Sequence, residues 1–100
     1  MLTSKQRSFL RALGNEMEPI LTIGKGGISA TVIEQLDQAL SARELIKARV
    51  LPHTEYESRS IAEEMATAIN CEIVQVIGRN ILFYRQAQPG VSSKIPWDQM

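Results

Sequence analysis

Residues 22–28, with the sequence TIGKGGI, constrain the fold more than any other stretch of the chain. An apolar run over residues 19–23 stops at a Gly-Lys-Gly-Gly turn, and a helical pattern begins at once. A helix that starts at Ile28 or Ser29 directs its unpaired N–H groups and its positive dipole end into that turn. A lysine on a glycine-rich backbone at a helix N-terminus is typical of an anion site, and phosphate is the usual anion.

A tight strand-to-helix turn is the simpler interpretation of the same residues. Such a turn needs roughly one glycine, or two, whereas Gly24, Gly26 and Gly27 all surround Lys25 here. The surplus of glycine beside a cation favours a phosphate-binding loop. The nucleotide-binding patterns GxxxxGK[ST] and GxGxxG are absent from the sequence. The loop therefore indicates phosphate binding without indicating a nucleotide-dependent enzyme.

Composition predicts one soluble domain. The chain has 100 residues, of which 44% are hydrophobic and 22% charged, the balance of an ordinary globular protein. We expect no membrane segment and no signal peptide, and the lone Cys71 fits a reducing compartment, so a cytoplasmic location is predicted. Eleven basic and eleven acidic residues give zero net charge, but they occupy different segments. A fold that separates them would be bipolar.

Periodicity and end signals predict the order α-β-α-β-α-β-β. The expected helices span residues 3–15, 28–41 and 54–69, and the expected strands span residues 19–23, 44–50, 71–77 and 81–85. Thr3 with Gln6 and Thr54 with Glu57 have the form of capping boxes. Gly14-Asn15 is interpreted as a helix stop and Asn70 as a C-cap. The fold class is thus α/β, a four-stranded mixed sheet backed by helices.

Two strands carry further information. In residues 44–50, Lys47 and Arg49 fall on one face, about 7 Å apart, a distance close to phosphate spacing along a nucleic acid. An edge strand protected by cations against aggregation explains the same pattern equally well. Residues 71–77 are apolar on both faces, which predicts a central strand. The short link over residues 78–80 predicts that the last two strands form a hairpin.

The chain changes character after residue 85. Pro89-Gly90, Ser92-Ser93 and Pro96 break any regular pattern. We therefore expect a domain over residues 1–85 and an extended tail over residues 86–100. Trp97 either docks this tail onto the domain or is exposed, and the sequence leaves both possibilities open.

Four blocks of sequence resemble the CRM domain (chloroplast RNA splicing and ribosome maturation), specifically its YhbY-type bacterial stand-alone form. They are PILTIGKGG at residues 19–27, ELIK at 44–47, VIG at 76–78 and LFYR at 82–85. The resemblance covers residues 2–85 and leaves the tail unmatched. It implies a fold similar to the C-terminal domain of bacterial translation initiation factor three. Family members often carry histidine before the ELIK block, where this chain has Arg43.

The resemblance implies an RNA-binding module associated with precursors of the large ribosomal subunit. The family's GxxG loop falls on residues 24–27, where backbone N–H groups and Lys25 would clamp the sugar-phosphate backbone, as a KH domain does. Lys47 and Arg49, with Arg43 and Arg79, would extend the phosphate track. Such contacts position RNA without reading its sequence, and few aromatic residues are available for base stacking, so specificity is expected to come from RNA shape.

Other functions find less support in the residues. His53 and Cys71 are single and far apart in sequence, so neither a catalytic pair nor a metal set is predicted, and we expect no enzyme activity, cofactor or small-molecule substrate. The alternative is a protein-protein adaptor that works within a ribosomal or other assembly without touching RNA, and zero net charge suits it. Salt dependence separates the two, because phosphate contacts release counterions. We expect a monomer.

Overall fold

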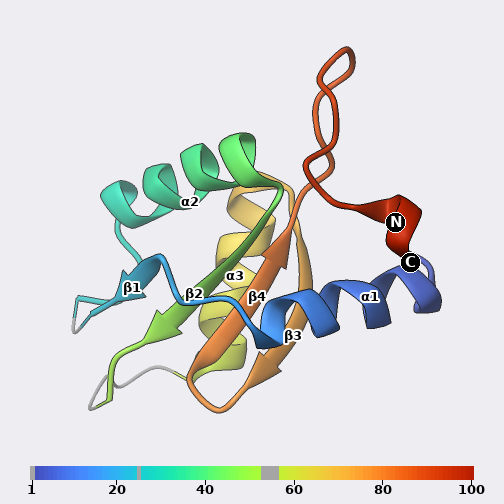
Figure 1. Ribbon diagram of the computed structural model, residues 1–100. Coiled ribbons are helices and arrows are strands. Elements are labelled where there is room, and N and C mark those ends of the chain that lie inside the picture. Colours follow the sequence, from blue (N-terminus) through green and yellow to red (C-terminus); the bar gives the residue numbers. More distant parts are fainter. Residues whose placement is uncertain (1, 25, 53–56) are drawn as a thin grey trace.

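The computed structural model describes residues 2–24, 26–52 and 57–100. Its elements follow the predicted order and form one α/β domain (Figure 1). They are α1 (Ser4–Asn15), β1 (Leu21–Ile23), α2 (Ala30–Arg43), β2 (Leu45–Val50), α3 (Ser58–Ile69), β3 (Glu72–Ile77), β4 (Asn80–Tyr84) and the short 3-10 helix η1 (Trp97–Gln99). Within the described ranges, every helix is too short or too polar to cross a lipid bilayer.

The predicted helix caps were confirmed at the start of α1 and at the end of α3. The capping box of Thr3 and Gln6 at α1 is confirmed, with both reciprocal hydrogen bonds present. Asn70 caps the C-terminus of α3 in the left-handed conformation, at φ 56°, as predicted. The proposed box at Thr54 lies outside the described residues. Its partner Glu57 is instead the N-cap residue of α3 and makes no side-chain capping bond.

The sheet has the strand order β1-β2-β4-β3. β1 and β2 are parallel, whereas β4 runs antiparallel to both β2 and β3, so the mixed sheet and the final hairpin are confirmed. The central position predicted for residues 71–77 was wrong, whereas the sequence had left the position of residues 44–50 open. β2 is central, which removes the explanation of its cations as protection of an edge, and β3 is itself an edge strand. Ile73 and Val76 pack on the side of α2 and α3 and Val74 on the side of α1, which is why β3 resembled a central strand.

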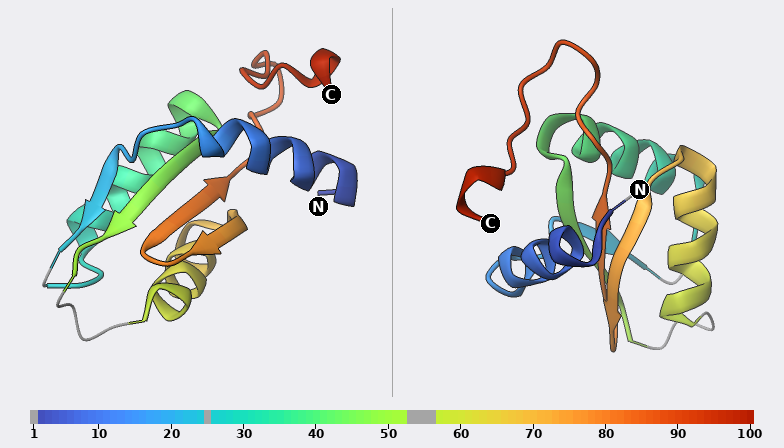
Figure 2. Two further views of the ribbon diagram at one scale, coloured as in Figure 1. Left: turned by 60° about the horizontal axis from the view of Figure 1, so that its bottom comes forward. Right: turned by 90° about the vertical axis from the view of Figure 1, so that its right-hand side faces the viewer.

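Helices cover the two faces of the sheet unequally (Figure 2). α2 and α3 pack on one face over the larger core cluster, whose fully buried members include Ile46, Ile81 and Phe83. α1 and the C-terminal segment pack on the other face, around Leu10 and Leu82. The result is a three-layer arrangement in which α1 is the only α-helix of the described chain on its face.

α1 ends at Asn15, as predicted, but Gly14 is not the residue that stops the helix. It lies inside the last turn and is buried, and the helix continues to Asn15 with Glu16 as its C-cap in a right-handed conformation. A Cβ built on Gly14 would lie 2.5 Å from Leu82 Cδ2. The glycine is therefore needed because α1 lies directly against β4 at this point, and not because the chain must turn.

We expect Gly14→Ala to destabilise the fold, although alanine normally favours a helix by about 1 kcal/mol. Leu82 is buried and its Cδ2 would lie only 2.5 Å from the added methyl group, so the substitution overpacks the contact at a cost of about 1–3 kcal/mol. Urea unfolding followed by circular dichroism measures the difference. In a Leu82→Ala background the clash is gone, and there the same substitution should be neutral or stabilising. A gain of stability in the wild-type background would contradict the packing explanation.

The C-terminal segment packs back onto the domain. Trp97 contacts Phe9 and Tyr84, with ring centroids 5.9 Å and 6.0 Å away, and Ile95 is buried. The carboxylate of Glu44, which is 3% exposed, accepts hydrogen bonds from the Ser93 hydroxyl (2.8 Å) and from the backbone N–H of residue 94. Of the two possibilities that the sequence left open for Trp97, the structure has the docked one.

Candidate nucleic-acid interface

The glycine loop, residues 24–27, connects β1 to the start of α2. The Gly27 N–H donates a hydrogen bond of 2.9 Å to the Gly24 carbonyl oxygen, so the loop closes as a tight turn. Gly27 is buried and has a φ of 68°, a conformation that costs an L-residue about 1–2 kcal/mol. Lys25, the predicted cation of this loop, lies outside the described residues. The turn itself thus accounts for one glycine, Gly27.

The other two glycines are not required by the fold. A Cβ on Gly24 would lie 3.8 Å from Leu51 Cδ1, an ordinary contact, and a Cβ on Gly26 would meet nothing within 4 Å. Neither residue has a positive φ. Gly26 is exposed at the surface. Since neither glycine is needed for a positive φ or for close packing, the remaining reason for glycine is that a ligand can approach the backbone closely.

The N-terminus of α2 follows the loop directly. Ser29 is the N-cap, and its hydroxyl accepts a hydrogen bond of 3.2 Å from the Val32 N–H. The preceding N–H groups of the first turn have no partner within the helix, and the helix dipole places partial positive charge there. Because Ser29 and Ala30 are exposed, this charge faces solvent beside Gly26. The loop and the helix start together can bind an anion.

Backbone hydrogen bonds connect the end of β2 to the end of β1 and to the turn between β3 and β4, beside the glycine loop. The Leu51 N–H donates to the Ile23 carbonyl at 2.9 Å, and the Val50 N–H donates to the Arg79 carbonyl at 2.7 Å. The Arg79 guanidinium in turn donates to the Leu51 carbonyl at 3.3 Å. The hairpin turn of β3 and β4 and the glycine loop therefore lie at the same end of the sheet, and Arg79 is held there.

Lys47 and Arg49 lie on the same face of the sheet as α1, in the part that the helix does not cover. Arg49 pairs with Thr22 on one side and Asn80 on the other, and Asn80 pairs with Ile77. These four paired residues, Thr22, Arg49, Asn80 and Ile77, are exposed, whereas Lys47 is half-buried. We call Thr22, Lys47, Arg49, Ile77 and Asn80 the uncovered sheet face. It adjoins the glycine loop at the ends of β1 and β2.

Arg43 lies apart from the other predicted residues. It is the last residue of α2, a helix of 14 residues, which at 1.5 Å per residue is roughly 20 Å long. The glycine loop is at the opposite end of this helix (Figure 1). The structure thus brings together the loop, Arg49 and Arg79, with Lys47 nearby on the same face, and leaves Arg43 out.

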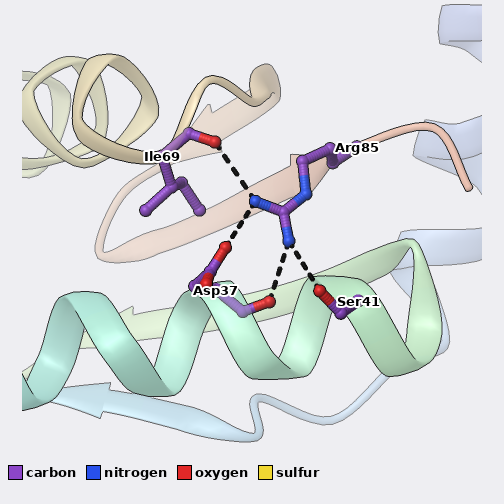
Figure 3. Close-up of polar contacts among 4 residues, drawn as sticks. All are labelled: Asp37, Ser41, Ile69 and Arg85. Atoms are coloured by element: carbon purple, nitrogen blue, oxygen red, sulfur yellow. Dashed lines mark hydrogen bonds and ion pairs between the residues drawn. The ribbon is translucent and has the colours of Figure 1, made fainter. Parts of the chain in front are cut away.

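Sequence reasoning missed the polar and apolar neighbours of the cations. Thr22, Ile77 and Asn80 join the site only through the register of the sheet, for which the sequence contains no local signal. It also gave no role to Arg85, whose side chain connects α2 to α3 (Figure 3). The guanidinium donates to Asp37 Oδ1 at 2.6 Å and to the Ser41 hydroxyl at 2.9 Å on α2, and to the Ile69 carbonyl at 3.1 Å on α3.

Titratable groups with altered pKa values lie away from this site. Burial raises the pKa of the Cys71 thiol to about 11, partly opposed by the Arg85 charge. Burial, and then the carboxylates of Glu44 and Glu72, raise the pKa of Tyr84. A thiol with so high a pKa is a poor nucleophile near neutral pH. In the part of the chain that the structure describes, no cluster of histidine, cysteine and carboxylate side chains could hold a metal.

The sequence of residues 2–85 matches the model of the CRS1/YhbY (CRM) domain, which accounts for nearly the whole chain. The chain belongs to the CRM-domain family. This confirms the resemblance seen in the four sequence blocks. The match ends at residue 85, just after β4, so the family's domain contains the glycine loop, the sheet and the helices α1, α2 and α3.

Three known proteins are similar to this chain over 63% to 100% of their own length. The probable RNA-binding protein YqeI of Bacillus subtilis is 38% identical over 96% of this chain and 100% of its own. The probable RNA-binding protein MJ0652 of Methanocaldococcus jannaschii is 39% identical over 84% of this chain and 63% of its own. The solution structure of the hypothetical protein SAV1595 from Staphylococcus aureus has a TM-score of 0.77 and 42% identity, over 96% of this chain and 100% of that one.

Proposed function

We propose that this CRM-domain protein binds RNA by clamping the sugar-phosphate backbone between the glycine loop and the N-terminus of α2. The proposed target is ribosomal RNA in a precursor of the large subunit, bound by a cytoplasmic monomer without a cofactor. The names of the relatives support RNA as the ligand. One observation carries the location: Gly24 and Gly26 are glycines that the fold does not need, beside a helix start open to solvent.

Arg49, Lys47 and Arg79 extend the track from the loop along the uncovered sheet face. Side chains two positions apart on one strand face are about 7 Å apart, which suits successive phosphates. Arg43 is left out of this track because it lies at the far end of α2. Contacts of this kind hold and orient the RNA, and they do not by themselves read its sequence.

Zero net charge is compatible with this function because the charge of the uncovered sheet face differs from the net charge of the whole chain. The uncovered sheet face has two cations and no acidic residue. The exposed carboxylates of Glu63 and Glu64 lie on α3, in the layer on the opposite face of the sheet. A polyanion therefore meets local positive charge at the uncovered sheet face, although the molecule as a whole is neutral.

Replacing both Lys47 and Arg49 with glutamine is expected to flatten the salt dependence of RNA binding. Each phosphate contact contributes about 0.7–0.9 to the slope of log affinity against log salt, so the slope should fall by about 1.5. Fluorescence anisotropy with a stem-loop fragment of large-subunit ribosomal RNA, from low to moderate salt, measures it. Affinity at low salt should fall as well.

The matched control is the double variant Arg43→Gln/Arg59→Gln, which removes the same charge from α2 and α3. It should keep the wild-type slope, because Arg43 lies at the far end of α2 and Arg59 lies on α3, on the opposite face of the sheet from Lys47 and Arg49. Equal losses in both double variants would show that only net charge matters. Wild-type binding without salt dependence would contradict the phosphate clamp and favour a protein-protein adaptor.

A further inference from the structure

A groove opens on the uncovered sheet face where α1 ends. Its volume is about 180 Å³, and its walls come from the C-terminal end of α1 and from β2, β3 and β4. The residues that line it include Asn15, Lys47, Gln75, Ile77 and Asn80. One wall of the groove lies where Gly14 brings α1 directly against Leu82.

The size and lining of the groove suit one small planar ring. Ligand pockets for drug-sized molecules measure about 300–1,000 Å³, so a groove of about 180 Å³ holds only a fragment of that size. Asn15, Gln75 and Asn80 supply amide groups, which both donate and accept hydrogen bonds. Ile77, whose side chain is 58% exposed, supplies an apolar surface beside them. A heterocyclic base has the same combination of polar edges and apolar faces.

Charge indicates that the ring belongs to an anionic chain. Lys47 is the one charged residue among the described residues that line the groove, and no carboxylate lines it. Arg49 follows on the same strand face, about 7 Å further towards the glycine loop. A ring in the groove would thus lie next to Lys47 and Arg49. These cations are on the side of the groove that faces the glycine loop, where the RNA backbone is proposed to bind.

We infer that the groove receives an unpaired nucleobase of the RNA whose backbone the glycine loop holds. This inference rests on the proposed function and makes it more specific. In an RNA duplex the bases are stacked and their edges are occupied, whereas single-stranded loops and bulges present bases that can be splayed into a protein. The preferred ligand is then RNA with unpaired nucleotides, and Ile77 takes the part that aromatic residues take in many RNA-binding proteins.

The test compares three probes by fluorescence anisotropy: the ribosomal stem-loop, an unstructured mixed-sequence RNA decamer and the same decamer without bases. The decamer with bases is expected to bind roughly tenfold more tightly than the abasic one, given the usual contribution of a bound base. The variant Gln75→Ala/Ile77→Ala should lose this difference and keep its affinity for the abasic chain. The matched control, Gln35→Ala/Val91→Ala, should behave as wild type.

The outcomes separate the inference from the function on which it rests. If the stem-loop binds but the two decamers bind equally, or neither binds, the groove takes no base and the phosphate clamp stands. If the groove variant keeps the difference between the decamers, the base is bound elsewhere and the inference fails. If none of the three probes binds, the proposed function fails as well. Circular dichroism confirms that the variants fold, which is expected because Gln75 and Ile77 are on an edge strand and partly exposed.

Discussion

Replacing Gly26 with aspartate is expected to weaken RNA binding at least about tenfold while leaving stability unchanged. A side chain at this position meets nothing within 4 Å and the backbone has no positive φ, so the fold accepts it. The new carboxylate, however, occupies the space beside the N-terminus of α2 where a phosphate is proposed to bind. Like charges placed together at an interface cost several kcal/mol, and each 1.4 kcal/mol is a factor of ten in affinity. Anisotropy with the ribosomal stem-loop measures the change.

Gly26→Asn is the matched control for this substitution. Asparagine has nearly the same size and shape as aspartate but no charge, so its effect isolates the steric part. We expect a smaller loss for asparagine and a difference between the two that shrinks with added salt. Gly27 is unsuitable for the same experiment, because its φ of 68° would make any side chain destabilising. Wild-type affinity in folded Gly26→Asp would remove the glycine loop from the interface.

Arg85→Met is expected to lower the free energy of unfolding by about 2 kcal/mol, the scale of hydrogen bonds to a charged group. The guanidinium joins α2 to the C-terminal end of α3 through the carboxylate and carbonyl of Asp37, the Ser41 hydroxyl and the Ile69 carbonyl (Figure 3). Methionine keeps much of the apolar stem and removes every donor. In a domain of this size the melting temperature should fall by roughly 10 °C.

Urea and thermal unfolding followed by circular dichroism measure the effect of Arg85→Met. The comparison is Arg59→Met, which removes an exposed arginine from α3 and is expected to change stability by less than about 0.5 kcal/mol. RNA affinity below the melting transition should be unchanged in both variants, because Arg85 lies outside the proposed track. A fall in RNA affinity with unchanged stability would move Arg85 from a structural role to the interface.

Local signals in the sequence were sufficient for the order of elements but not for their arrangement. The helices and strands follow from periodicity and capping, which depend on neighbours a few residues away. Strand order depends on pairing between distant segments, so the central place of β2 and the edge position of β3 could not be derived locally. Gly14 shows the same limit: a glycine near a helix end usually stops the helix, and only the contact with Leu82 explains why it does not.

The candidate site was predictable to the same degree. The glycine loop is contiguous in sequence, so its position between strand and helix was correctly derived. The alternation of β2 correctly placed Lys47 and Arg49 on one face. Arg43 was included because it is a cation at the position before the ELIK block where family members often carry histidine, but the length of α2 separates it from the loop. Thr22 and Asn80 could be found only once the strand register was known.

The most direct test of the proposed interface is a titration of the nitrogen-15-labelled protein with the ribosomal stem-loop, followed by two-dimensional amide NMR. It reports the location of binding without any substitution. We predict that the largest shifts belong to Gly24, Gly26 and Gly27 and to residues of the uncovered sheet face, Arg49 and Asn80 among them. Shifts confined to α3 or to the C-terminal segment, with the glycine loop unaffected, would contradict the account.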